Sequence, residues 1–232
     1  MKLSIIIPVY NEEKTLQKIV QRVVAVDLGK IDKEIIIVDD ASTDKTLEII
    51  KELKLKNKDI KVYSHEKNKG KGAAIRTALK YITGDIFVIQ DGDLEYNPEN
   101  FKRLIHPILE KKFKVVYGSR MLGKRTGFVF YSYYFGNKLL SLLTKILYFQ
   151  NITDMETCYK VISIDVLKKI FPLESNSFDI EPEITAKIIM AGYKILELPI
   201  NYHCRSFEEG KKIRWKDGVV AIYKLIKYRF IR

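Results

Sequence analysis

The fold is decided by residues 86–93, which read IFVIQDGD, an apolar run that ends in two carboxylates. Four consecutive apolar residues, rich in β-branched side chains, predict a strand that is buried on both faces. Asp91 and Asp93 follow at its carboxyl end, where parallel sheets bind their ligands. These carboxylates are suited to hold Mg²⁺ or Mn²⁺, because hard cations take oxygen ligands. A solvated turn is the alternative interpretation of so short an acidic triplet.

Apolar runs of the same kind recur on both sides of this stretch and alternate with segments of helical periodicity. The alternation predicts an α/β fold, with a mostly parallel sheet and helices on its faces. The predicted strands are 3–8, 34–39, 61–65, 86–90 and 114–117. The predicted helices cover 16–24, then Leu47 to Leu53 behind a cap at Ser42 or Thr43, and then 72–81.

Polar clusters follow the predicted strands and should meet at one edge of the sheet. They are Tyr10 to Glu12, Asp39-Asp40, Asn68 to Gly72, and the acidic triplet. The Asp39 and Asp40 carboxylates can accept hydrogen bonds from a nucleoside, or serve as a turn acid and a helix cap. Residues 68–72 offer flexible glycines, two ammonium groups and a helix N-terminus for a phosphate. They lack the GK[ST] ending of a P-loop, so an ordinary turn remains the alternative.

The 232 residues include 41 Lys and Arg against 29 Asp and Glu, a net charge of +12 that favours phosphate-rich partners. A nucleic-acid partner is not expected, since the sequence has no aromatic-basic RNA signature.

Cys158 and Cys204 lack metal-binding spacing and are interpreted as thiols in a reducing compartment. The first apolar run ends at Pro8, too early for a signal peptide, which predicts a cytoplasmic protein.

The second half of the chain carries apolar stretches of a different kind. The longest, 128–149, contains charged residues and a Gly136-Asn137 break, so a bilayer span is not expected. Glu181 to Met190 is predicted to form a helix. Two amphipathic helices predict either peripheral contact with the cytoplasmic membrane face or packing on the sheet. The apolar face of the first helix carries Leu139, Leu142, Leu143 and Ile146, and another face carries Lys138, Ser141 and Lys145. The apolar stripe of the second helix consists of Val219, Ile222, Tyr223 and Ile226, and its positive charges are Lys216, Lys224, Lys227, Arg229 and Arg232.

The order of the motifs resembles that of family 2 glycosyltransferases. The matching segments are 6–12 (IIPVYNE), 38–44 (VDDASTD), 68–72 (NKGKG), 91–93 (DGD) and 118–120 (GSR). The likeness is greatest to the dolichyl-phosphate mannose synthase and polyprenyl-phosphate glucosyltransferase branch. It implies a Rossmann-like GT-A fold in a single domain. Residues 1–120 would form the nucleotide-sugar-binding half, and residues 121–232 the acceptor-side extension with its amphipathic helices and basic tail.

The site residues combine the strand-exit clusters with what the resemblance implies. The substrate-binding candidates are Pro8, Tyr10, Glu12, Val38, Asp39, Asp40, Lys69, Gly70, Asp91 and Gly92. The metal candidates are Asp91, Asp93 and Glu95, with Glu95 standing where mannose synthases usually have Gln. The catalytic candidates are Asp93, Arg120, Asp154, Arg205 and Lys211. Arg205 and Lys211 look like a basic pair that closes over the diphosphate, which predicts a lid over 205–212.

The resemblance implies an inverting transfer of a hexose, from a donor of the GDP-mannose or UDP-glucose type, to a dolichyl or undecaprenyl phosphate. Residues 154–157 (DMET) depart from the mannose synthase pattern, which leaves open a saccharide hydroxyl as acceptor. Asp154 or Glu156 would then have to take its proton. A non-catalytic nucleotide-sugar-binding protein is the alternative from another functional class. The sequence indicates no particular oligomeric state.

Overall fold

The computed structural model describes residues 1–127, 131–205 and 215–231, without the side chains of residues 131–133, 215 and 216. The strands are β1 (Lys2–Val9), β2 (Asp32–Asp39), β3 (Ile60–Ser64), β4 (Ile86–Ile89), β5 (Val115–Ser119), β6 (Arg125–Gly127), β7 (Lys160–Ser163), β8 (Leu196–Pro199) and β9 (Tyr202–Cys204). The helices are α1 (Leu16–Ala25), α2 (Thr46–Lys56), α3 (Lys71–Leu79), α4 (Asn100–Leu109), α5 (Tyr131–Tyr148), α6 (Ile164–Ile170), α7 (Ile180–Met190) and α8 (Trp215–Phe230).

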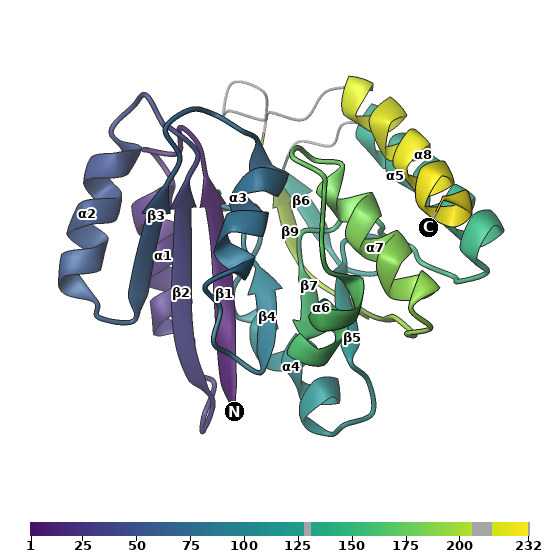
Figure 1. Ribbon diagram of the computed structural model, residues 1–232. Helices are drawn as coiled ribbons and strands as arrows, with labels where there is room; N and C mark the ends of the chain where they lie inside the picture. The colour runs from purple at the N-terminus through teal and green to yellow at the C-terminus, as the bar shows by residue number, and fades with distance from the viewer. Residues whose placement is uncertain (128–130, 206–214, 232) are drawn as a thin grey trace.

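A seven-stranded sheet in the order β3-β2-β1-β4-β7-β5-β8 forms the centre of the molecule. Its strands are parallel except β7, which is antiparallel to both β4 and β5. Helix α2 lies beyond the β3 end of the sheet, whereas α5 and α8 lie side by side at the opposite end (Figure 1). This arrangement confirms the predicted α/β fold. Because β7 lies between β4 and β5, strands from both halves of the sequence share one sheet.

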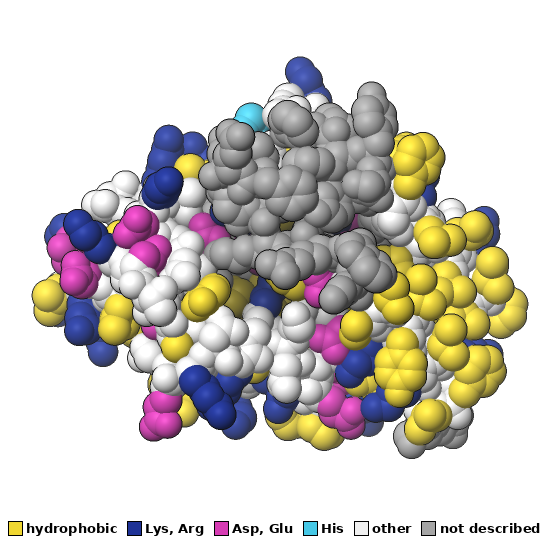
Figure 2. All heavy atoms as spheres, turned by 90° about the horizontal axis from the view of Figure 1, so that it is seen from above, with side chains coloured by type: hydrophobic (Ala, Val, Ile, Leu, Met, Phe, Trp, Pro, Cys, Tyr) yellow, Lys and Arg dark blue, Asp and Glu magenta, His cyan; other side chains and the backbone are white. Residues whose placement is uncertain are grey.

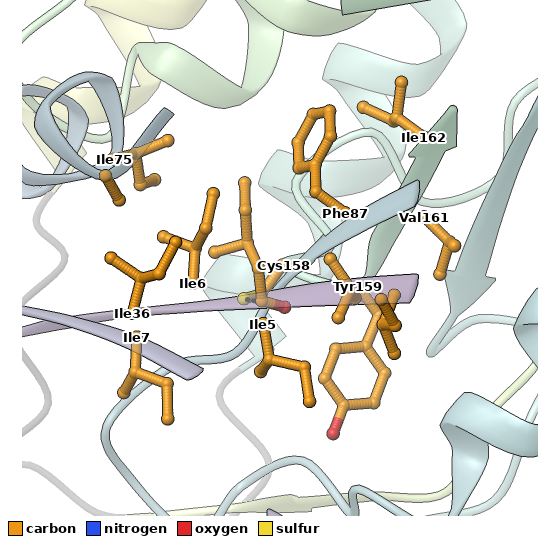
Figure 3. Packing of buried hydrophobic residues seen from close by; sticks show 14 of the residues in the cluster. Ile5, Ile6, Ile7, Ile36, Ile75, Phe87, Cys158, Tyr159, Val161 and Ile162 are labelled. Atoms are coloured by element: carbon orange, nitrogen blue, oxygen red, sulfur yellow. Dashed lines mark hydrogen bonds between the residues drawn. The ribbon is translucent and has the colours of Figure 1, made fainter. Parts of the chain in front are cut away.

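Side chains alternate between the two faces of β1, and both faces are covered by helices. Figure 3 shows Ile6 on the same side as Ile75 of α3, whereas Ile5 and Ile7 point to the opposite side. All four are fully buried. The near-continuous apolar strands therefore reflect burial on both faces, as the sequence predicts.

The predicted cap of the second helix is wrong. Helix α2 begins at Thr46, without a side-chain cap from Ser42 or Thr43. The Ser42 hydroxyl instead accepts a hydrogen bond from the Asn11 N–H at 2.9 Å, and the Thr46 N–H donates to Asp44 at 2.9 Å. The turn after β2 is thus fastened to the turn after β1, which is a tertiary contact that local capping rules do not anticipate.

Helices α5, α7 and α8 form a second, smaller core. Its buried residues include Leu140 of α5, Ala186 of α7, and Ala221 and Leu225 of α8. The Tyr148 hydroxyl donates to the Leu225 carbonyl oxygen at 2.6 Å, which ties α5 to α8. No described helix is long and apolar enough to cross a bilayer.

Candidate active site

A cavity of about 820 Å³ lies at the carboxyl ends of β1, β2 and β4 and extends to α5 and the start of α8. Most of the predicted site residues line it: Pro8, Tyr10, Glu12, Asp40, Gly70, Asp91, Gly92, Asp93, Glu95, Arg120 and Arg205. Val38 is different, because its side chain is fully buried in the core and cannot contact a ligand. Lys69 is exposed, and Lys211 lies outside the described residues, as does most of the predicted lid.

The cavity's carboxylates are paired with cations of the chain itself. Lys71 at the start of α3 places its Nζ 2.7 Å from Asp91 Oδ1. Arg205, after β9, lies 3.0 Å from Asp93 Oδ2 and 3.2 Å from Glu12 Oε2. Arg205 therefore joins the second half of the chain to the turns after β1 and β4. The sequence motif contains Lys71, but its contact with Asp91 depends on the packing of α3 beside the sheet.

The three predicted metal ligands do not form a ready-made metal site. The Glu95 carboxylate accepts hydrogen bonds from the Tyr202 hydroxyl at 2.6 Å and the Arg205 N–H at 2.9 Å. In the described part of the chain, no three His, Cys, Asp or Glu residues are grouped as a metal cluster would require. Glu95 is held by Tyr202 and Arg205, and its place beside Asp91 and Asp93 as a third metal ligand remains a prediction.

The remaining donors still fit a hard cation. Burial and the nearby carboxylates of Glu95 and Asp91 raise the pKa of Asp93 to about 8, because a second negative charge is unfavourable there. A divalent cation would relieve this crowding. Mg²⁺ is commonly bound through one or two carboxylates together with substrate phosphates and water. Asp91 and Asp93 provide that number of protein ligands.

Asp40 supports the turn that precedes α3. Its carboxylate accepts hydrogen bonds from the N–H groups of Lys69 and Gly70 at 2.9 and 2.7 Å. It also lies 2.6 Å from Nδ1 of the half-buried His65, whose Nε2 is 2.8 Å from the Thr77 hydroxyl in α3. Asp39 accepts from the Ser42 N–H and lies outside the cavity lining. No local sequence pattern identified His65 as part of this support.

Arg120, at the end of β5, is held by Asp154. Its Nε and Nη2 donate to the two carboxyl oxygens at 2.8 and 2.7 Å, and its N–H donates at 2.7 Å. Asn137 of α5 also donates to Asp154, at 3.0 Å. Burial opposes ionisation of Asp154, but Arg120 lowers its pKa below the ordinary value. Asp154 is therefore a charged partner of Arg120 rather than a free proton acceptor.

A buried ion pair joins β7 to α7 beside the cavity. Lys160 is fully buried, and its Nζ lies 2.5 Å from Glu181 Oε2. Lys71 approaches the other Glu181 oxygen at 3.4 Å. Glu181 lies in the first turn of α7, as its position in the sequence indicates, but its carboxylate contacts these two lysines. Asp91, Lys71, Glu181 and Lys160 thus form a row of alternating charges that runs from the cavity wall into the core.

Helix α5 buries three uncharged polar residues and exposes several large apolar side chains beside Lys138 and Lys145. Asn137, Ser141 and Thr144 are buried, whereas Leu139, Leu142 and Ile146 each expose more than half of their surface. The prediction that Ser141 shares a polar outer face with Lys138 and Lys145 is wrong, because the Ser141 hydroxyl donates to the Thr153 carbonyl oxygen. Hydrophobic side chains gather on the surface at the α5 and α8 end of the molecule (Figure 2).

The glycosyl transferase family 2 model matches residues 4–171. A dolichol-phosphate mannosyltransferase of Pyrococcus furiosus is 32% identical over 98% of this chain, which spans 64% of that relative. An uncharacterized protein of Methanocaldococcus jannaschii is 25% identical, over 97% of this chain and 91% of its own.

Solved structures share the fold. Glucosyl-3-phosphoglycerate synthase from Mycobacterium tuberculosis, in complex with Mn²⁺, UDP and phosphoglyceric acid, has a TM-score of 0.74 at 19% identity, covering 100% of this chain and 79% of its own. A mannosyltransferase from Pyrobaculum calidifontis, in complex with GDP-Man and Mn²⁺, has a TM-score of 0.64 at 18% identity, covering 87% and 56%. The chain therefore belongs to glycosyl transferase family 2 and has the GT-A fold.

Proposed function

We propose that the protein transfers a hexose, with inversion, from a nucleotide sugar to a polyprenyl phosphate at the cytoplasmic membrane face. The observation that carries this proposal is the cavity itself. It joins paired carboxylates and cations at the sheet edge to the helices that bear the exposed apolar surface. The similarity to a dolichol-phosphate mannosyltransferase supports the same donor and acceptor classes.

The nucleotide sugar would bind at the sheet edge, between the turn after β1 and the start of α3. Asp91 and Asp93 would hold a divalent cation, Mg²⁺ or Mn²⁺, with Glu95 beside them. Such a cation supplies neutralisation of the departing diphosphate. The relatives solved with Mn²⁺ support this assignment.

In the transfer, an acceptor oxygen forms a bond to the anomeric carbon while the bond from that carbon to the diphosphate breaks. The departing nucleoside diphosphate takes the bonding electron pair. Arg120 and Arg205 line the cavity and would stabilise this charge, joined by Lys211. Asp154 fixes the guanidinium of Arg120 in place, so this guanidinium is oriented before the substrate arrives. A phosphate acceptor is already anionic and requires no strong base.

The outward apolar face of α5 supports a membrane-bound acceptor. Helix α5 buries Asn137, Ser141 and Thr144 together with Leu140, and it exposes large apolar side chains that an ordinary surface helix would bury. Val219, Tyr223 and Ile226 of α8 extend the same exposed surface. An interfacial helix places such a face among the lipid acyl chains. The lipid's phosphate would then reach the cavity where Asn137 and Leu140 line it.

The tail helix contributes less positive charge to this surface than its sequence suggests. Lys224 pairs with Asp179 at 3.2 Å, and Lys227 pairs with Glu174 at 3.3 Å. The Lys216 side chain and Arg232 lie outside the described residues. Membrane contact should therefore depend mainly on apolar burial and only weakly on salt.

A second candidate is transfer to a saccharide hydroxyl. The observation that favours it is Glu156, which lines the cavity and has a buried Oε1 without a hydrogen-bond partner among the described residues. A carboxylate in this position is suited to take the proton of a hydroxyl. The geometry favours Glu156 over Asp154 for that role, because Asp154 is bound to Arg120.

The test is a turnover assay with GDP-mannose, UDP-glucose and related donors, with and without polyprenyl phosphate or a panel of saccharides. Formation of a glycosylated lipid phosphate is the expected result. If only a saccharide product forms, transfer to a saccharide hydroxyl replaces transfer to a polyprenyl phosphate as the proposed function. Tight donor binding without any turnover, in every acceptor condition, would indicate a nucleotide-sugar-binding protein.

A further inference from the structure

Glu156 lies at the acceptor end of the cavity with one carboxyl oxygen free. Its Oε1 is buried and has no hydrogen-bond partner in the described part of the chain. Its backbone N–H donates to Asn137 Oδ1 at 3.3 Å, which fixes the residue against α5. Buried polar atoms in native proteins are usually hydrogen-bonded, so this oxygen in a cavity-lining residue is expected to gain a partner from water or a bound ligand.

Charged groups of both signs surround Glu156. Burial and the carboxylates of Glu181 and Asp154 oppose its ionisation, whereas Lys160 and Arg120 favour it. Together they raise the pKa of Glu156 to about 7. Asp217 of α8 also lines the cavity. Near neutral pH, Glu156 is therefore present in both a neutral form, which can donate a hydrogen bond, and an anionic form, which can only accept one.

We propose, given the proposed transfer to a polyprenyl phosphate, that Glu156 recognises the acceptor phosphate as a neutral carboxylic acid that donates a hydrogen bond to it. A lipid that follows the apolar face of α5 brings its phosphate to the wall formed by Asn137 and Glu156. Two negative groups in contact inside a buried cavity repel each other strongly, so the carboxyl group retains or gains a proton. When Glu156 begins ionised, that proton comes from the solvent.

This assignment separates the two acceptor classes by protonation state. A phosphate acceptor requires Glu156 as a hydrogen-bond donor, which the amide of glutamine can replace. A hydroxyl acceptor requires Glu156 as an anion that removes a proton, which glutamine cannot do. Glu156→Gln therefore distinguishes recognition of a phosphate from base catalysis at the same position.

The experiment is calorimetric titration of the whole protein with a short-chain polyprenyl phosphate, in two buffers of different ionisation enthalpy. At about pH 8, above the pKa of Glu156, binding to the wild type should take up close to one extra proton relative to Glu156→Gln. At about pH 6 this difference should nearly vanish. The phosphate's own ionisation contributes equally to both proteins and cancels in the comparison.

The variants give a matched set. Glu156→Gln should keep phosphate affinity within about threefold, whereas Glu156→Ala should weaken it on the order of tenfold, because it loses the hydrogen bond. Glu52→Gln, on the exposed face of α2, serves as the control and should behave as the wild type. Thermal unfolding of each variant confirms that the protein is folded.

Equal proton uptake by the wild type and Glu156→Gln would overturn the proposal. So would loss of lipid-phosphate transfer in a folded Glu156→Gln at every pH, because that result requires an ionised carboxylate. A wild type that neither binds nor glycosylates polyprenyl phosphate would overturn the proposed function as well. That outcome is recognised without any variant.

Discussion

At the residue scale, the site is built from charges that already have partners. Arg205 pairs with both Asp93 and Glu12, Lys71 pairs with Asp91, and Asp154 holds Arg120. These pairs keep the cavity walls ordered before any ligand is present. A cation and a diphosphate would exchange partners with them: the cation takes the carboxylates, and the phosphates take the arginine. The site can therefore bind both ligands without leaving a buried charge unpaired.

Asp154→Asn should remove the charge that holds Arg120. Because Asp154 is completely buried, breaking this pair should lower the free energy of unfolding by about 3–5 kcal/mol. Donor turnover should fall as well, since Arg120 loses its orientation. Denaturant unfolding measures the first effect. Asp165→Asn is the control, because its pair with Lys114 is exposed and should cost at most about 1 kcal/mol. An equal loss of unfolding free energy in Asp154→Asn and Asp165→Asn would contradict the assigned role of Asp154.

Glu34 provides a pH prediction outside the site. Burial alone would raise its pKa, but hydrogen bonds from Lys61, Ser4 and Thr83 lower it from an ordinary 4.5 to about 2. Its folded pKa is depressed, so its contribution to stability is present above about pH 4.5 and is lost as the pH falls toward 2. The stability difference between the wild type and Glu34→Gln should shrink over that window in acid titrations followed by circular dichroism. A pH-independent difference would exclude this linkage.

At the element scale, the large apolar side chains that α5 exposes define the outer surface at this end of the molecule. Leu142→Glu on its exposed face should reduce binding to liposomes, because a charged side chain cannot enter the acyl region. Leu55→Glu on α2 is the matched control, since Leu55 is also an exposed leucine but lies at the far end of the sheet. Co-sedimentation at low and high salt provides the measurement. Unchanged binding by Leu142→Glu would place the membrane contact elsewhere.

The start of α3 depends on a glycine. Gly70 has φ +96°, and a Cβ there would lie 2.2 Å from the Asn176 carbonyl oxygen. Gly70→Ala should therefore displace the turn that Asp40 holds and, with it, Lys71. Gly192→Ala is the control, because Gly192 has φ +84° but open space around it, so it carries only the backbone strain of about 1–2 kcal/mol.

Nucleotide affinity, measured by calorimetry, should fall in Gly70→Ala and stay unchanged in Gly192→Ala. Unfolding measurements should show both proteins destabilised, with the larger effect at Gly70. If donor affinity is the same in the two variants, the turn before α3 is not part of the donor site.

At the scale of the whole molecule, the sequence predicts the first five strands well because each is a short apolar run followed by polar residues. It does not predict that β7 enters the sheet antiparallel between β4 and β5, since that pairing depends on the path of residues far apart in the chain. For the same reason, the contact of Arg205 with Glu12 could not be predicted from the sequence and is seen only in the structure. The sequence also does not predict which face of α5 is buried, because both of its faces contain apolar residues.

The most direct test of the proposed function is formation of a glycosylated polyprenyl phosphate from a labelled sugar nucleotide, with Mn²⁺ or Mg²⁺ and with excess chelator. The proposed function predicts a lipid-linked product that requires the cation. Asp93→Asn should lower its formation by on the order of a hundredfold or more. A wild-type protein that makes the product at full rate in excess chelator, or one that makes only a saccharide product, would contradict the proposal.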